Sequence, residues 1–179
     1  LLGRIYRGAS EKQITTIRQE QDKARRQQLK QDLPAICFSG TFRQRNDKGL
    51  VSHSGLICLD FDKFPSTRTL NKWREQLKAD PYTFCLFTSP SGDGLKVLVK
   101  IPPEPENHKG YFDRLEQYYD CEYFDISCSN LSRVCYESHD PDIYYNEKSL
   151  EWTELMEEGP VDLGTDNPAL ILTSENRII

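Results

Sequence analysis

Two aspartates separated by one residue end an apolar run near the middle of the chain. The segment LICLDFD carries Asp60 and Asp62, and alternate residues of a β-strand point to the same face. Two carboxylates on one face repel each other and are costly to bury unpaired. A pair of Mg²⁺ or Mn²⁺ ions would remove that cost, because hard cations prefer carboxylate oxygens. A strand that simply ends in hydrated polar residues is the alternative, and the Asp-x-Asp pair alone does not decide between them.

A turn rich in Ser and Gly, followed by a lysine, is the second candidate for chemistry. Its sequence, SPSGDGLK, contains Ser89, Ser91, Gly92, Gly94 and Lys96. The backbone N–H groups of such a turn can approach an anion closely, and the lysine adds a positive charge. The pattern is compatible with a phosphate contact and equally with an ordinary hairpin whose lysine lies in water.

A third carboxylate, Asp125, precedes a loop of Ser and Asn residues that ends at Arg133. Asp125 would complete a two-metal site, and the guanidinium of Arg133 could bind a triphosphate through two hydrogen bonds. An Asp–Arg ion pair that braces the loop is the alternative.

The elements that must position these residues begin with a helix predicted over residues 10–31 and short β-like runs from residue 33. The remaining predicted elements are the strand LICLDFD, a helix over 66–79, the strands YTFCLFT and LKVLVKI, a helix over 107–120, the strands CEYFDI and SRVCYES, and a short helix over 148–157. From Leu56 the order is strand, helix, strand, strand, helix, strand.

This order is the βαββαβ pattern of ferredoxin-like and RNA-recognition-motif (RRM) folds. We therefore expect an α+β protein with an RRM/ferredoxin-like core and an N-terminal helical and β extension. In the usual strand order 4-1-3-2, the strand with Asp60 and Asp62 lies between LKVLVKI and the strand with Asp125. Three motifs distant in sequence would then meet on one sheet surface.

The size of the chain predicts one substantial domain, since it has 179 residues of which 37% are hydrophobic and 28% charged. We expect a basic N-terminal helix over 1–32, a catalytic core over 33–158 and a tail or linker over 159–179. No apolar run is long enough to span a membrane and no signal peptide begins the chain, so we expect a cytoplasmic protein without a membrane partner. The six cysteines form no C-x-x-C pair, which favours structural thiols in a reducing compartment.

The charge is unevenly distributed along the chain. Residues 1–50 hold 11 Lys/Arg against 5 Asp/Glu, a net of +6, and the remainder carries −11 of the total of −5. A basic arm that touches phosphates and a hydrated helix both fit this pattern.

The segments SGLICLDFD, SPSGDGLKVLVKI and FDISCSNLSRVCYESHDPDIYYN resemble the archaeo-eukaryotic primase superfamily. Within it they are most similar to bacterial primase-polymerase domains related to the VirE N-terminal family, some of them CRISPR-associated. The resemblance covers roughly residues 33–146.

The resemblance implies template-dependent nucleotidyl transfer with Mg²⁺ or Mn²⁺, using nucleoside triphosphates and single-stranded or primer–template nucleic acid. A fused or associated helicase, or CRISPR adaptation proteins, would be further partners. The implied metal-binding and catalytic residues are Asp60, Asp62 and Asp125. The nucleotide-binding residues are Ser89, Ser91, Gly92, Gly94, Lys96 and Arg133, of which Ser89 is included because it belongs to the same turn. The template-binding residues are Arg43 and Arg45.

Lys96 occupies the position where the wider superfamily has His. A lysine can hold a phosphate as a point charge, so the resemblance still implies triphosphate binding but not proton shuttling.

Three other functions are compatible with the sequence. One is a non-catalytic nucleotide- or nucleic-acid-binding module fused to a helicase, a second is a metal-dependent phosphodiesterase or nuclease, and a third is an RRM-type RNA binder. The RRM binder is disfavoured by carboxylates on the expected sheet face, where such modules carry aromatic residues. The choice between ribo- and deoxynucleotides, and between priming and extension, is left open by the sequence.

Overall fold

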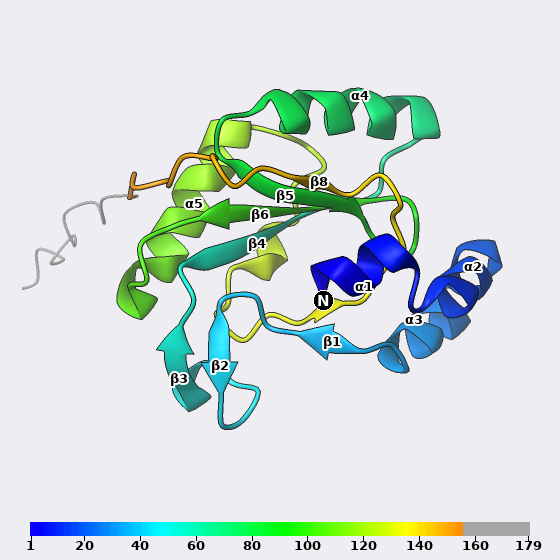
Figure 1. The fold of residues 1–179 in the computed structure, drawn as a ribbon, viewed down its shortest axis with the longest axis horizontal. Helices are drawn as coiled ribbons and strands as arrows, with labels where there is room; N and C mark the ends of the chain where they lie inside the picture. The colour runs from blue at the N-terminus through cyan, green and yellow to red at the C-terminus, as the bar shows by residue number, and fades with distance from the viewer. Residues whose placement is uncertain (156–179) are drawn as a thin grey trace, which may run out of the picture.

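A four-stranded antiparallel sheet lies at the centre of the structure, which is a computed structural model that describes residues 1–155 (Figure 1). Its strands are β4 (Leu56–Phe61), β6 (Leu95–Lys100), β5 (Thr83–Thr88) and β8 (Tyr144–Tyr145), in that spatial order. Alternating Val, Leu, Ile and aromatic residues favour these strands. The predicted α+β class is confirmed, with five α-helices and antiparallel sheets in the described part of the chain.

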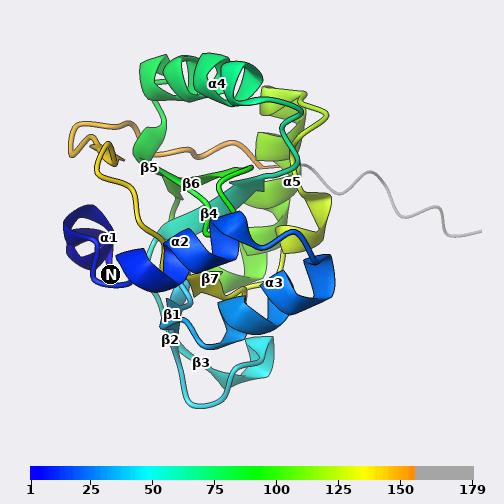
Figure 2. The same cartoon turned by 90° about the vertical axis from the view of Figure 1, so that its right-hand side faces the viewer.

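Two amphipathic helices, α4 (Thr67–Ala79) and α5 (His108–Tyr119), cover one face of this sheet (Figures 1 and 2). Ser66 caps α4 by accepting a hydrogen bond from the backbone N–H of Thr69. The main hydrophobic core lies between these helices and the sheet, and Leu59, Phe61 and Val97 contribute to it. Because strand side chains alternate, Cys58, Asp60 and Lys96 belong to the opposite face.

The N-terminal helices lie on that opposite face (Figure 2). They are α1 (Leu2–Arg7), α2 (Glu11–Gln19) and α3 (Lys23–Gln31). The single helix predicted over 10–31 is therefore wrong. Glu20 leaves the helical region with φ −70° and ψ 124°, and the side chain of Asp22 caps a new helix by accepting from the N–H of Arg25. Asp22 therefore starts a separate helix, because its side chain binds a free backbone N–H of the first turn of α3.

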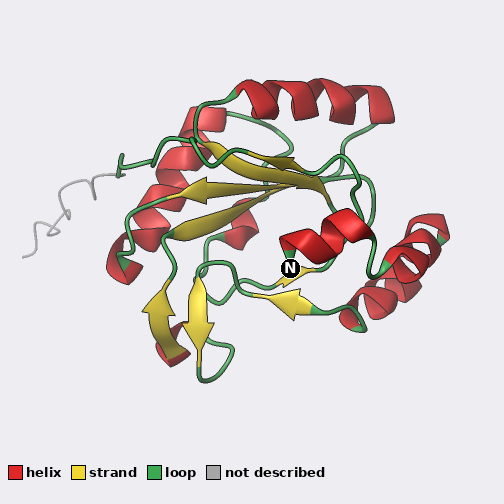
Figure 3. Ribbon diagram, in the orientation of Figure 1, coloured by secondary structure: helices red, strands yellow, loops and turns green. Residues whose placement is uncertain are grey.

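Two small antiparallel pairs complete the fold (Figure 3). β1 (Ala35–Ile36) pairs with β7 (Cys135–Tyr136), and β2 (Gly40–Phe42) forms a hairpin with β3 (Leu50–His53). Gly40 is required in the hairpin, because a Cβ there would overlap the carbonyl oxygen of Ser52.

Three further predicted elements differ from the structure. The predicted strand CEYFDI is a turn closed by Phe124 N–H to Cys121 O, and only the bridge between Phe61 and Phe124 joins it to β4. The run SRVCYES forms only β7, outside the main sheet.

The predicted helix over 148–157 is not formed by its described residues, 148–155. Within this segment, Trp152 donates its backbone N–H to Lys100 O. Its last two residues and the predicted tail over 159–179 lie outside the described residues. Within residues 1–155, no helix has the length and hydrophobicity that crossing a bilayer requires.

Candidate functional site

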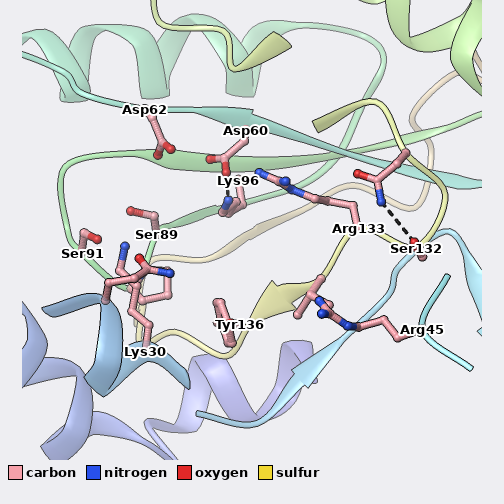
Figure 4. Close-up of a pocket in the computed structure, with 14 residues that line it drawn as sticks. Lys30, Arg45, Asp60, Asp62, Ser89, Ser91, Lys96, Ser132, Arg133 and Tyr136 are labelled. Atoms are coloured by element: carbon pink, nitrogen blue, oxygen red, sulfur yellow. Dashed lines mark hydrogen bonds and ion pairs between the residues drawn. The ribbon is translucent and has the colours of Figure 1, made fainter. Parts of the chain in front are cut away.

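A cavity of about 480 Å³ opens on the sheet face opposite α4 and α5 (Figure 4). Seven of the residues singled out in the sequence line it, namely Arg45, Asp60, Asp62, Ser89, Ser91, Lys96 and Arg133. They come from β4, from β6, from the turn between β5 and β6, from the β2–β3 hairpin and from the loop before β7. The fold thus brings together residues that lie as far apart in the chain as Arg45 and Arg133.

Asp60 forms an ion pair with Lys96 at the base of the cavity. The two residues are direct cross-strand partners on β4 and β6, and Asp60 is only 5% exposed. Burial acts to lower the pKa of Lys96, but attraction by Asp60 outweighs it and the pKa is raised. The ion pair uses Oδ2 of Asp60, whereas its buried Oδ1 has no hydrogen-bond partner within residues 1–155.

Asp62 follows β4 and lies on the same side of the sheet as Asp60 (Figure 4). Its backbone N–H donates to Tyr123 O, which fixes the chain at the end of the strand. Burial, and next the negative charge of Asp60, raise the pKa of Asp62 to about 6. The carboxylate is therefore held in a position where a cation would be favourable.

Asp125 lies beside β4, because its backbone N–H donates to Asp60 O over 2.8 Å. Its Oδ1 accepts hydrogen bonds from the N–H and Oγ of Ser127, and Arg133 lies 3.5 Å from its Oδ2. Burial opposes ionisation, but these hydrogen bonds outweigh it and the pKa of Asp125 is lowered. Arg133 thus both contacts Asp125 and lines the cavity.

One oxygen each from Asp60 and Asp125, together with the thiol sulfur of Cys128, lie within 4.8 Å of one another. Cys128 lies 3.1 Å from Asp125 Oδ2 and 3.9 Å from Asp60 Oδ2. Carboxylate oxygens suit Mg²⁺ and Mn²⁺, and the thiol adds a softer donor. The unpartnered Oδ1 of Asp60 shows that the buried carboxylate has an unused ligand atom. These residues therefore fit a divalent metal ion.

The turn between β5 and β6 forms one side of the cavity. It is closed by Ser89 N–H to Gly94 O and by Gly92 N–H to Ser89 O. Gly92 has a φ of +82°, and a Cβ at Gly94 would overlap the carboxylate of Asp62. Both glycines are needed by the backbone. The hydroxyl of Ser89 is buried and has no hydrogen-bond partner within the described residues.

Four of the residues predicted for the site do not line the cavity. Asp125 lies in the metal-compatible cluster, and Gly92 and Gly94 shape the turn. The exposed Arg43 lies on the hairpin, where its backbone N–H donates to Gly49 O.

Several residues that line the cavity were not predicted as site residues from the sequence, namely Gln27, Lys30, Pro90, Asn130, Ser132, Val134 and Tyr136. Lys30 and Gln27 come from α3, which was predicted only as a basic surface helix. The Pro34–Glu137 backbone hydrogen bond and the β1–β7 pair place Tyr136 beneath α2 and α3. No local sequence pattern indicates this long-range packing.

Arg18 on α2 holds the turn in place without lining the cavity. Its guanidinium donates to the carbonyl oxygens of Ser89 (3.2 Å) and His139 (2.9 Å). Gly92 lies directly against the Arg18 side chain, since a Cβ at this position would lie 3.2 Å from Cδ of Arg18. Arg18 thus joins α2, the turn and the segment after β7 into one unit.

The chain matches the model of a known protein family. The sequence profile described as the BT4734-like, N-terminal domain matches residues 28–145. No curated protein and no solved structure matches the chain significantly. The matched range begins within α3 and includes every residue predicted for the site. Because the match covers more than half of the 179 residues, the chain belongs to the BT4734-like N-terminal domain family.

Proposed function

We propose that the cavity carries out metal-dependent nucleotidyl transfer, in which a nucleotide is added to a 3′-hydroxyl during primer synthesis or extension. One observation carries the proposal. The cavity sets two carboxylates, Asp60 and Asp62, against four cationic side chains, those of Lys30, Arg45, Lys96 and Arg133.

This mixture of charges favours a metal–triphosphate ligand over either part alone. Two carboxylates close together, one with an unused buried oxygen, favour a divalent cation. Four cationic groups exceed what two carboxylates need, so they favour a polyanion as well. A nucleoside triphosphate bound with Mg²⁺ or Mn²⁺ meets both requirements.

Asp60, Asp62 and Asp125 would hold the ions. When bound, these would favour attack by the 3′-hydroxyl and neutralise charge on the leaving pyrophosphate. Lys96 and Arg133 would bind the phosphates and stabilise the negative charge that develops on them. The turn with Ser89, Ser91, Gly92 and Gly94 would approach the phosphates through its backbone, because no side chain at the glycines stands in the way.

The β2–β3 hairpin is the proposed contact for single-stranded or primer–template nucleic acid. Arg43 and Arg45 are exposed on it, and Arg45 also lines the cavity. A positive side chain at the cavity edge can contact the phosphates of a template strand next to the incoming nucleotide. A fused or associated helicase, or CRISPR adaptation proteins, would supply the context for such synthesis.

The fold and the family are compatible with this proposal. β4, α4 and β5 form a split β–α–β unit with β6 between the two strands, as in the first half of a ferredoxin-like core. The family match covers the three segments that resemble primase-polymerases of the VirE N-terminal type, except for the last residue of the third segment, Asn146.

A second function, nucleotide binding without catalysis, is favoured by the Asp60–Lys96 ion pair. Lys96 already neutralises one carboxylate, so a polyanion could bind with fewer metal ions or none. This function would also leave Lys96, where the wider superfamily has His, without a catalytic role.

Incorporation of a labelled nucleotide on single-stranded template, with and without primer and with Mg²⁺ or Mn²⁺, tests the proposal. We expect incorporation by the wild type and none by the Asp60→Ala/Asp62→Ala variant. Asp142→Ala is the control, because Asp142 is exposed and away from the cavity. Circular dichroism would confirm that all three proteins are folded. Incorporation by the double variant would show that the site is wrong, and nucleotide binding by the wild type without incorporation would favour the binding module.

A further inference from the structure

Lys30 is a cationic side chain that the three sequence motifs do not include. It lies near the C-terminal end of α3 and faces the cavity from the side opposite Asp60 and Asp62 (Figure 4). The side chain is partly buried, and it makes no hydrogen bond or ion pair with any residue in 1–155. A partly buried lysine without a partner is unusual, because its charge loses hydration and gains nothing in return.

The surroundings of Lys30 add to this cost. Burial lowers the pKa of Lys30, and the positive charges of Arg26 and Lys96 lower it further, whereas Asp62 and Asp93 act in the opposite direction. A bound polyanion would restore the favourable interactions that the charge lacks. The position therefore suits a phosphate ligand better than it suits the empty cavity.

The fold holds Lys30 at this place through its neighbours, since α3 has no buried residue of its own. Leu29 packs against the buried cluster of Ile14, Ile17 and Leu33, and Tyr136 packs against the same cluster. Arg18 of α2 in turn binds the carbonyl oxygen of Ser89 in the turn. The position of Lys30 relative to the turn is thus set by contacts that do not involve Lys30 itself.

We propose that α3 is a wall of the nucleotide site and that Lys30 binds the terminal phosphate of the incoming triphosphate. The proposal rests on the function proposed above. In that reaction the α-phosphate lies at the carboxylates, so the remaining phosphates extend away from Asp60 and Asp62. The turn with Ser89 and Ser91 leads from these carboxylates towards α3, where Lys30 is the cation on the cavity wall.

The test compares the binding of a non-hydrolysable nucleoside triphosphate and of the corresponding diphosphate, by calorimetry in the presence of Mg²⁺. We expect Lys30→Ala to weaken triphosphate binding by about tenfold, the loss of one charge-assisted hydrogen bond, and to change diphosphate binding by less than about twofold. Lys30→Arg should retain most of the triphosphate affinity, because arginine also binds phosphate. Lys23→Ala is the matched control, since it removes the same charge from an exposed position at the start of α3.

Each other outcome overturns the inference in a recognisable way. If the wild type binds no triphosphate, the proposed function fails and the role of Lys30 fails with it. If the wild type binds triphosphate and Lys30→Ala binds it equally well, only the role of Lys30 is wrong. If Lys30→Ala weakens triphosphate and diphosphate binding equally, or if Lys23→Ala weakens triphosphate binding as much as Lys30→Ala does, then Lys30 does not contact the terminal phosphate. The loss of affinity would then be a general effect of charge or structure.

Discussion

The carboxylate of Asp62 should lower the stability of the metal-free protein at neutral pH. The pKa of Asp62 rises from 3.8 to about 6 because the side chain is partly buried and lies near Asp60. A shift of this size corresponds to about 3 kcal/mol for ionising the group in the folded protein. Water still reaches part of the side chain, so we expect the Asp62→Asn substitution to recover only about 1–2 kcal/mol.

The sign of the pH dependence follows from the direction of the shift. The folded protein binds the proton of Asp62 more tightly than the unfolded chain does, so this group makes stability fall as the pH rises from 3.8 to about 6. Above about pH 6 the ionised carboxylate of Asp62 destabilises the folded protein by the full amount, and below pH 3.8 this destabilisation is absent. The advantage of Asp62→Asn over the wild type should therefore be largest at pH 7 and shrink as the pH falls below 6.

Urea denaturation at pH 7 and at about pH 4.5, in the presence of a chelator, measures both quantities. Asp142→Asn is the control, because it removes an exposed carboxylate away from the cavity. Added Mg²⁺ or Mn²⁺ should stabilise the wild type and have a smaller effect on Asp62→Asn, since the variant lacks one proposed ligand. If Asp62→Asn is no more stable than the wild type at pH 7, or if its gain in stability does not change with pH, then ionised Asp62 does not destabilise the fold.

Two other predictions concern the hairpin and the N-terminal helices. Arg45→Ala should weaken the binding of single-stranded DNA and reduce the salt dependence of binding by about one phosphate contact. Fluorescence anisotropy between low and moderate salt measures both quantities, and the control Lys12→Ala on α2 should leave both unchanged. Glu137→Gln should destabilise the fold by about 2 kcal/mol in urea denaturation, because the buried carboxylate accepts hydrogen bonds from Arg4 (2.6 Å) and Ser10 (2.6 Å). Burial opposes the ionisation of Glu137, but these bonds outweigh it and lower its pKa, so its contribution should be lost as the pH falls below 4.5. An unchanged salt dependence for Arg45→Ala, or a Glu137→Gln variant as stable as the wild type, would contradict the respective prediction.

The central strands and helices could be predicted because their periodicity is local. The alternation in LKVLVKI and the spacing of Leu70 and Leu77 in α4 require no knowledge of distant residues. The relation between Asp60 and Lys96 follows from the pairing of two such strands. The ion pair between them was nevertheless missed, because the sequence analysis placed Lys96 either on a phosphate or in water.

The remaining differences arise where tertiary contacts override local preference. CEYFDI has the composition of a strand, but the left-handed conformation of Asp120 (φ 38°) and the capping of Ser127 by Asp125 turn the chain there. Even so, Asp125 still reaches β4 through one backbone hydrogen bond to Asp60, so its expected place next to that strand is retained. Lys30 and Tyr136 could not be assigned to the cavity, because α2 and α3 dock through contacts with residues more than a hundred positions away.

Catalysis at the cavity can be measured as the extension of a primer by one labelled nucleotide in a single turnover, with Mn²⁺ or Mg²⁺ present. We expect the wild type to form the extended primer and the Asp60→Asn/Asp62→Asn variant to leave the primer unextended. A wild type that binds the triphosphate but leaves the primer unchanged, under conditions where both ligands are saturating, would contradict catalysis at this cavity.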